Sequence, residues 1–341
     1  MNKKHMKKRL LIFAAAILMI ITTVTVHYKT EVRSEAAGIK TQQETKKKII
    51  GATLASSQAS YQYAIGNLLV AEAEKDPDYK LEIQYAEWNV KKQEDQMRDF
   101  IRRKVDAIIF CPVNAKSYLN VLREAKNAGI PVINLNMKVD TVSTEYITTY
   151  VGASMSEEAD LAGQLVVECL NGKKGKVGII EGSQGTDPQI YRTQTFLEYL
   201  SSYPDVEVVG IEEANWSRAK AGLAASRLLS QNPDINVFYC HDSNMALGVY
   251  DMLKARGIQD KIQVIGIGNE TEHMEAVKSG KLYGIVTQPP EYEAEYAWSC
   301  AKRAASGEIL RLWYKNLVVS LTKDNIDTYF RPSLDKKKDC H

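Results

Sequence analysis

Apolar runs alternate with helical patterns along most of this chain. Within residues 105–136, an apolar run over Ala107–Phe110 precedes a polar corner and a stretch with helical spacing of its apolar residues. Gly129 and a second apolar run, Val132–Leu135, follow. Strands that are apolar throughout are typical of parallel sheets buried on both faces, and a left-handed glycine commonly ends a helix. The segment therefore predicts a strand, a helix and a second strand.

The same order of elements returns about 130 residues later, which indicates two lobes built alike. An apolar run ends at Cys240, and a polar corner covers His241–Asn244. A helical pattern then leads to Gly257 and to a strand over Val264–Ile267.

Strand and helix patterns also alternate through the rest of the chain. Further strands are expected at residues 49–54, 81–85, 146–151, 177–181, 206–211, 282–287 and 317–321. Helices are expected at residues 61–75, 90–103, 157–170, 188–200, 218–229, 272–278 and in a stretch ending at 305. Short connections between alternating elements imply parallel sheets covered by helices on both faces. The predicted fold class is α/β, with two similar doubly wound parallel-sheet lobes.

In open sheets of this kind, ligands bind outside the carboxyl ends of the strands, so two facing lobes would share one cleft. The corners at those ends are rich in Ser, Asn, Asp, Arg, Gln, Tyr and Trp. Amides and guanidinium groups pair with neighbouring hydroxyls, and an aromatic face covers the C–H side of a sugar ring. The pattern favours a hydroxylated ligand and leaves other polar ligands open.

The first residues differ from the rest. A basic cluster, Lys3–Arg9, precedes Leu10–Val26, which contains no charged residue. This predicts a signal peptide or N-terminal membrane anchor over residues 1–30 and a polar tether over 31–48. Everything downstream is then expected outside the cytoplasm, exported or anchored to the bacterial cell membrane through this segment only. We favour an uncleaved anchor, because the small-residue cleavage site at 34–37 is weak and no lipoprotein cysteine is present.

Composition adds two constraints. The 341 residues are 45% hydrophobic and 25% charged, so disorder is excluded for the bulk of the chain. The formal net charge of +2 hides a division, because residues 1–48 hold 11 basic and 3 acidic residues and leave 33 basic against 39 acidic residues for the remainder. A mildly acidic folded part argues against nucleic acid or an anionic membrane as its ligand.

Motifs for catalysis and metal binding are poor. The five cysteines are odd in number and widely spaced, so neither a disulfide framework nor a zinc site is expected. Gly172, Gly175 and Gly178 precede a strand and lack the dinucleotide-binding spacing, and no phosphate loop or nucleophile elbow occurs. The histidines do not cluster; His241, at a strand end, is a candidate hydrogen-bond donor. We therefore expect no enzyme, no catalytic residue, no cofactor and no metal.

Four stretches, in the right order, carry a family resemblance. They are VDAIIFCPV with AKNAGIPVINLN, GTDPQIYRTQTF, NPDINVFYCHDSNMALGVYDMLKARG and VKSGKLYGIVTQPP. From about residue 48 to 321 the chain resembles the ribose/galactose-type periplasmic sugar-binding proteins, a type I fold shared by the ligand domains of LacI-type repressors. The resemblance implies two lobes joined by a hinge. Lobe 1 would comprise 49–152 plus 289–316, lobe 2 would comprise 153–288 plus 317–335, and 336–341 would be a basic tail.

The resemblance also implies which residues bind the ligand. Arg192 matches an arginine that reaches sugar hydroxyls, Trp216 matches an aromatic that borders the ring, and Gln288 matches a glutamine at the end of the hinge strand. Tyr61 and Tyr63 fall where the first lobe offers aromatics. The candidate ligand-binding residues are Ser56, Tyr61, Tyr63, Asn136, Arg192, Trp216, Asp242, Asn269 and Gln288.

Several corners depart from the family's pattern. Asn136-Met137 stands where Asp-Arg is common, and Cys111 replaces an asparagine of the first lobe. Asp242 replaces an asparagine, and Gly268 replaces an aspartate. The ligand is thus open among a modified sugar, a cyclitol and a less hydroxylated molecule.

Simpler roles are open for the same side chains. Arg192 could be a solvated surface residue, Trp216 a core residue, and Tyr61 could pack on the sheet. Asn136 and Asp242 could cap helices, as strand-end Asn and Asp often do.

The leading functional hypothesis is an extracytoplasmic solute-binding protein that closes its lobes around a sugar, cyclitol or related ligand and presents it to an ABC importer. The alternative is a membrane-anchored sensor that signals to a histidine kinase of a two-component system. A transcription regulator would need a DNA-binding segment before residue 48, where the export segment lies. A hydrolase or dehydrogenase would need a nucleophile–base pair or a phosphate loop.

Overall fold

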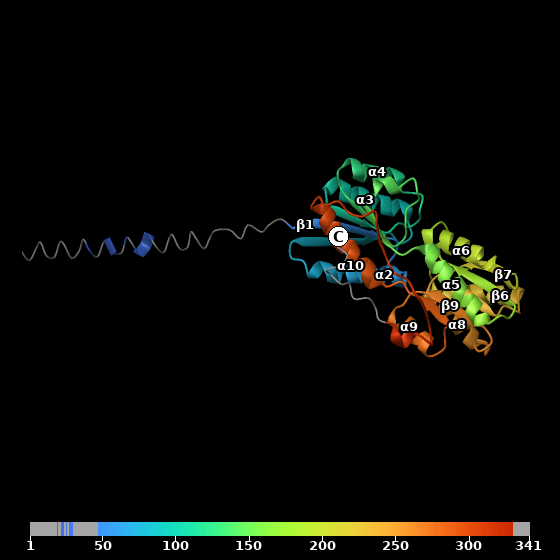
Figure 1. The fold of residues 1–341 in the computed structure, drawn as a ribbon. Helices are drawn as coiled ribbons and strands as arrows, with labels where there is room; N and C mark the ends of the chain where they lie inside the picture. The colour runs from blue at the N-terminus through green and yellow to red at the C-terminus, as the bar shows by residue number, and fades with distance from the viewer. Residues whose placement is uncertain (1–18, 20–21, 24, 26, 30–46, 330–341) are drawn as a thin grey trace, which may run out of the picture. The chain divides into compact units, whose positions relative to one another are not determined.

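The computed structural model describes residues 19, 22–23, 25, 27–29 and 47–329 (Figure 1). The predicted export or anchoring segment, the tether and the basic tail therefore lie wholly or almost wholly outside the described residues. Within the described part, no helix combines the length and apolar character needed to cross a bilayer. Residues 48–329 form one compact unit.

The first lobe is a six-stranded sheet in the order β11-β5-β4-β3-β1-β2, with every neighbouring pair parallel. Its strands are β1 (Lys48–Leu54), β2 (Tyr79–Tyr85), β3 (Ala107–Phe110), β4 (Val132–Leu135), β5 (Thr149–Gly152) and β11 (Trp313–Lys315). Its helices are α2 (Ser60–Glu74), α3 (Val90–Arg103), α4 (Leu119–Asn127) and α10 (Pro290–Ala305), with the short helix η1 (Thr144–Tyr146). Helices α3 and α4 cover one face of the sheet, and α2 and α10 cover the other (Figure 1).

The second lobe repeats this plan in the order β12-β10-β9-β8-β6-β7. Its strands are β6 (Gly175–Glu181), β7 (Val206–Glu213), β8 (Val237–Cys240), β9 (Gln263–Ile267), β10 (Gly284–Val286) and β12 (Ser320–Thr322). Its helices are α5 (Met155–Leu170), α6 (Asp187–Leu200), α7 (Arg218–Gln231), α8 (Ser243–Ala255) and α9 (Thr271–Lys278), with the short helix η2 (Ile326–Thr328). Strand β12 runs antiparallel to β10, and the other pairs are parallel.

These orders confirm the predicted α/β fold with two similar doubly wound lobes. In each lobe the strand order reverses between the first strand and the third, β1 and β3 in one lobe and β6 and β8 in the other. The chain passes between the two sheets three times, after β5, after β10 and after β11. A switch point of this kind is where doubly wound sheets bind ligands.

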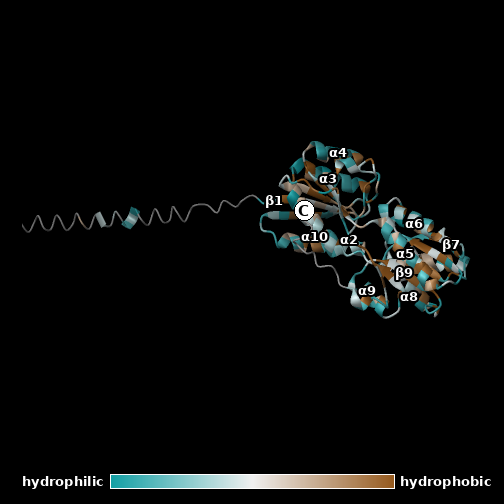
Figure 2. Cartoon of the chain, in the orientation of Figure 1, coloured by the Kyte–Doolittle hydropathy of each residue, from teal (hydrophilic) through white to brown (hydrophobic). Residues whose placement is uncertain are grey.

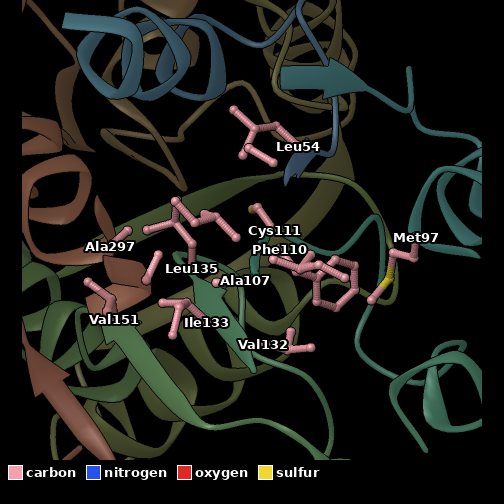
Figure 3. Packing of buried hydrophobic residues seen from close by; sticks show 14 of the residues in the cluster. Leu54, Met97, Ala107, Phe110, Cys111, Val132, Ile133, Leu135, Val151 and Ala297 are labelled. Atoms are coloured by element: carbon pink, nitrogen blue, oxygen red, sulfur yellow. The ribbon is translucent and has the colours of Figure 1, made fainter. Parts of the chain in front are cut away.

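Buried apolar side chains fix both faces of each sheet. All four residues of β3 and all four of β4 are buried, and their apolar side chains belong to one cluster with Leu54, Met97 and Ala297 from neighbouring elements (Figure 3). In the second lobe, alternate residues of one strand enter different cores, because Phe238 packs on one side of β8 and Tyr239 on the other. Polar residues gather on the outer helices (Figure 2).

The structure also departs from the predicted elements. Strand β11 has no counterpart in the prediction, because a strand of only three residues is too short to give a recognisable alternating pattern. The strand expected over 317–321 is confined to β12, where it pairs with β10. Gly129 is left-handed as predicted, with φ 71°.

Candidate functional site

One cavity lies between the lobes, at the carboxyl ends of their strands. It encloses about 510 Å³ of free space, part of it open to solvent. The first lobe lines it with Ala59, Ser60, Tyr61, Gln62, Trp88, Asn136 and Met137. The second lobe contributes chiefly Arg192, Trp216, Asp242, Asn244, Glu270, His273 and Gln288.

The first lobe presents a neutral, polar wall built around the start of α2. The helix begins after Ala59, which offers no side-chain cap, so its first N–H groups are left for other partners. Gln62 Nε2 donates to Asn136 Oδ1 at 2.9 Å. Asn136 directly follows β4. Its backbone is left-handed, with φ 60°, so the chain leaves the extended strand conformation at this residue. Asn136 is therefore a wall residue of the cavity and caps no helix.

A buried ion pair anchors the opposite wall. Arg192 Nε and Nη2 donate to Glu158 Oε2 at 3.0 and 2.7 Å, and both side chains are almost fully buried. Arg192 Nη1 also donates to the carbonyl of His241 at 2.5 Å, and Nη2 to Gln288 Oε1 at 3.2 Å. Burial raises the pKa of Glu158, and the Arg192 charge opposes that rise. The guanidinium thus holds the wall together and offers few free donors.

Asp242 has two roles at the same wall. Its Oδ1 accepts from the Met245 N–H at 2.5 Å and caps α8, as the simpler interpretation of the sequence expected, and it also lines the cavity. Burial raises the pKa of Asp242 to about 6, although the Met245 N–H lowers it. Nearby, His273 Nδ1 lies 2.5 Å from Glu270 Oε2.

Two tryptophans occupy equivalent places in the two lobes. Trp88 lies in AEWN, between β2 and α3, and Trp216 lies in ANWS, between β7 and α7. Both have left-handed backbones, with φ 60° and 59°, as do the residues that precede them. Bulky residues rarely adopt this conformation, and such strain clusters at functional sites. Both also line a larger neighbouring hollow, so the two indoles lie between the cavity and the space beyond it.

A buried carboxyl group lies behind the first-lobe wall. Glu293 of α10 accepts from Asn316 Nδ2 at 3.2 Å. Burial and, to a smaller extent, the charge of Glu158 raise its pKa to about 8, although Asn136, Tyr61 and Asn316 oppose the rise. Glu293 is therefore largely protonated at neutral pH.

Several buried polar atoms around the cavity have no hydrogen-bond partner among the described residues. Three belong to residues that line it: Tyr61 Oη, Gln62 Oε1 and Trp216 Nε1. Two more, Glu158 Oε1 and Glu293 Oε2, belong to buried carboxyl groups that contact wall residues without lining the cavity. Tyr61 lies close enough to affect the pKa of Glu293 without reaching hydrogen-bond geometry. Buried polar groups are normally paired, so a cluster of unpaired ones indicates a place where a bound molecule completes the bonds.

Six of the nine predicted residues line the cavity, and three do not. Ser56 is fully buried and donates to Glu87 Oε2 at 2.8 Å. Tyr63 is 52% exposed on α2. Asn269 is buried, and its Oδ1 accepts from the Gln288 N–H at 3.1 Å, so it holds a wall residue in place.

The candidate ligand-binding residues omitted Gln62, Trp88, Glu270 and His273, which line the cavity. The repeated pattern Ala-x-Trp before a helix cap was a signal that could have identified Trp88. The histidine expected at the cleft, His241, is fully buried, and its backbone carbonyl accepts a hydrogen bond from Arg192. Among the described residues, no group of three or more His, Cys, Asp or Glu side chains is placed to hold a metal.

Comparisons with known proteins agree with this geometry. Residues 50–309 match the family model described as periplasmic binding protein domain. The xylitol-binding protein of Mycolicibacterium smegmatis is 29% identical over 248 residues, which are 70% of this chain and 69% of that protein. The galactofuranose-binding protein of Escherichia coli is 28% identical, over 62% of this chain and 67% of its own.

A solved structure shows the same fold. An ABC transporter solute-binding protein from Bacillus halodurans, with bound myo-inositol, has 27% identity and a TM-score of 0.79. The match covers 84% of this chain and 99% of that one. From the family match over most of its length and from its two-lobed fold, the chain belongs to the periplasmic binding protein family.

Proposed function

We propose that this protein is an extracytoplasmic solute-binding protein that captures a small hydroxylated ligand, a sugar or sugar-like molecule, between its two lobes without chemical change. The observation that carries the proposal is the convergence of unpaired buried polar atoms on one cavity between the lobes. A ligand with hydroxyl groups would supply both donors and acceptors to those atoms.

The wall chemistry supports this ligand class. Tyr61 and Trp216 can donate, Gln62 Oε1 can accept, and the first N–H groups of α2 can meet a ligand oxygen. Two indoles border the same space, and an aromatic face suits the C–H side of a sugar ring. Six of the predicted ligand-binding residues, Tyr61, Asn136, Arg192, Trp216, Asp242 and Gln288, remain our candidates, and Gln62 and Trp88 join them.

Contacts between the lobes support capture by closure. The Ala115 N–H donates to the Gly185 carbonyl at 3.1 Å, and the Lys138 N–H donates to Asp187 Oδ2 at 3.4 Å. Each pair joins the first lobe to the second. Such contacts would hold the lobes together over a bound ligand and give a membrane partner a surface that differs between the loaded and empty protein.

The partner we propose is an ABC importer. The Bacillus halodurans relative is described as an ABC transporter solute-binding protein, and the other two relatives are described as binding proteins for a sugar and a sugar alcohol. The sensor with a histidine-kinase partner stays a prediction, as does the N-terminal export or anchoring segment. Importer genes beside the gene for this chain would favour the first, and kinase and response-regulator genes would favour the second.

A thermal-shift screen of the purified protein tests the ligand class. Pentoses, hexoses, cyclitols and other polyols would be added one at a time, each over a range of concentrations. A ligand that binds only the folded state raises Tm, by an amount that grows with its concentration relative to Kd. We expect at least one of these compounds to raise Tm in this way. If none does, the proposed ligand class is wrong, while the fold is unaffected.

A further inference from the structure

A second hollow adjoins the ligand cavity at the two tryptophans. This outer hollow has about 1420 Å³ of free space, part of it open to solvent. Four residues line both spaces: Ala59, Trp88, Trp216 and Asn244. The cavity and the outer hollow therefore share a border, and both lobes contribute to it.

The outer hollow lies at the side of the lobes away from the chain crossings. In the first lobe its lining residues follow β1, β2 and β3, and in the second lobe they follow β6, β7 and β8. These strands form the half of each sheet that lies farther from β11 or β12. The chain crosses between the lobes in the other half, after β5, β10 and β11. A ligand would therefore enter through the outer hollow when the lobes open about the crossings.

The border between the two spaces is aromatic. Trp88 packs against the apolar clusters of both lobes. Trp216 is buried, and its Nε1 has no hydrogen-bond partner among the described residues. Both tryptophans have left-handed backbones, a conformation that costs energy in a bulky residue. Two indoles held at this border at such a cost suit contact with the C–H faces of sugar rings on either side of it.

The walls of the outer hollow are rich in amide side chains. Four amides line it and do not line the cavity: Gln58, Asn114, Gln184 and Asn215. Asn114 accepts two backbone N–H groups through Oδ1, each at 3.0 Å, which leaves its amide nitrogen to donate. Gln184 Nε2 donates to Glu181 Oε2 at 2.8 Å, which leaves its Oε1 to accept. Sugar hydroxyls donate and accept, so they match a lining that offers both.

A direct contact between the lobes lies beside two of these amides. The Ala115 N–H donates to the Gly185 carbonyl at 3.1 Å, and these residues directly follow Asn114 and Gln184. A molecule in the outer hollow would touch the same two corners and would add to the contacts that hold the lobes together.

Charged side chains line the outer hollow as well: Glu213, Arg218 and Lys220. Arg218 is paired with Asp251 and Glu272, and Glu213 Oε1 accepts from the Gln184 N–H at 2.9 Å. Both signs of charge are present, so the ligand class follows from the amides and the indoles.

We propose that the outer hollow is a second subsite and that the ligand is a disaccharide or a similar glycoside, with one ring in the cavity and the second unit in the outer hollow. The inference rests on the proposed function and defines the size of its ligand. The bond that links the two units would cross the border formed by Trp88 and Trp216. The second unit would meet the indoles and the amides of both lobes.

Matched sugars test this proposal by calorimetric titration of the purified protein. The sets are glucose with maltose and cellobiose, galactose with lactose and melibiose, xylose with xylobiose, and myo-inositol with galactinol. Methyl glycosides of the three sugars separate the effect of a blocked anomeric hydroxyl from that of a second ring. In the set that fits, we expect a two-unit ligand to bind at least about ten-fold more tightly than either component, because the second unit adds contacts without a second loss of translational freedom.

Two variants outside the cavity locate the second unit. Ala219 is exposed in the first turn of α7 and lines only the outer hollow, so Ala219→Trp places a bulky ring in that space. Gln58→Ala removes an amide of the first lobe. Each should reduce the advantage of the two-unit ligand by at least about three-fold and leave the affinity for the single unit within about two-fold of wild type. Ala71→Trp is the matched control, because Ala71 is exposed on α2 and lines neither space; it should keep the wild-type advantage.

The outcomes separate this inference from the function on which it rests. If single sugars bind and no two-unit ligand binds about ten-fold more tightly than its components, the inference is wrong and the proposed function is intact. An advantage that is unchanged in both Ala219→Trp and Gln58→Ala would place the second unit elsewhere and would also overturn the inference. If no sugar, polyol or glycoside binds, the proposed function fails, and the inference fails with it.

Discussion

At the scale of single residues, burial decides what each polar side chain can do. The family resemblance implies that Arg192 reaches the ligand's hydroxyls, but most of its hydrogen-bonding capacity is used by Glu158 and two further partners. An Arg192→Ala variant would leave the buried Glu158 without its counter-charge, and breaking such a pair costs about 3–5 kcal/mol of stability. Changes at Trp216 or Gln62 therefore report on binding more cleanly than changes at Arg192.

The raised pKa of Glu293 predicts how the free energy of unfolding depends on pH. Its carboxyl has an ordinary pKa of 4.5 and is raised to about 8 in the folded protein, so the folded state holds a proton that the unfolded state releases between these values. The free energy of unfolding should therefore fall as pH rises through this window, by up to about 1.4 kcal/mol per pH unit from this group. Above about pH 8 the loss should level off.

Glu293→Gln should make that dependence shallower. Glutamine cannot titrate, and it retains an oxygen that can accept from Asn316. Urea unfolding of the wild type and the variant at several pH values between 5 and 8 would measure the two slopes. Equal slopes would show that Glu293 is not the group that holds the proton.

At the scale of elements, the strand-to-helix corners build the site, and their sequences predicted only part of it. The position of Asp242 just before α8 was readable, because strand-end aspartates cap helices. The directions of Ser56 and Asn269 were not, since tertiary packing turns one toward Glu87 and the other toward the backbone of Gln288. The direction of a side chain at such a corner depends on neighbours from distant segments of the chain, so the local sequence pattern does not predict it.

A second prediction concerns the close packing of Gly182 against the Trp216 ring. A Cβ built on Gly182 would lie 2.0 Å from the Trp216 ring, so Gly182→Ala should push the indole out of place. The ligand affinity should fall by about 1–3 kcal/mol, similar to the loss expected for Trp216→Ala. Calorimetric titration with a ligand from the thermal-shift screen would measure both.

A double variant shows whether the two residues act together. If Gly182 matters only because it makes room for the indole, Gly182→Ala should cost little further affinity in a Trp216→Ala background. Additive losses would mean that Gly182 affects the site by another route. Tyr63→Ala is the matched aromatic control, because Tyr63 is exposed and lies outside the cavity.

At the scale of the whole molecule, the repeat in the sequence predicted the architecture well. Two strand–helix–strand units about 130 residues apart correspond to β3-α4-β4 in one lobe and β8-α8-β9 in the other, at the same places in the two sheets. Buried parallel strands leave a strong apolar signal, so the fold was accessible from sequence. The boundaries of the lobes, with chain crossings after β5, β10 and β11, stay a proposal for how the hinge divides the chain.

The repeat also explains why the cavity lies where it does. Equivalent corners of two similar sheets bring Trp88 and Trp216 to one space, one from each lobe. Neither lobe alone encloses a ligand, because the neutral wall belongs to the first and the charged wall to the second. Binding should therefore couple the two lobes and change the surroundings of both indoles.

Tryptophan fluorescence tests the central claim, that the ligand is held between the lobes. A ligand from the thermal-shift screen would be titrated into the wild type and into the Trp88→Phe/Trp216→Phe variant, with calorimetry as the independent measure of binding. Trp298 lies in the first lobe's core and Trp313 on β11, outside the cavity. We predict a saturable emission change in the wild type, with the calorimetric midpoint, and its loss in the double variant. A bound ligand that leaves wild-type emission unchanged, or a full change in the double variant, would contradict a site between the lobes.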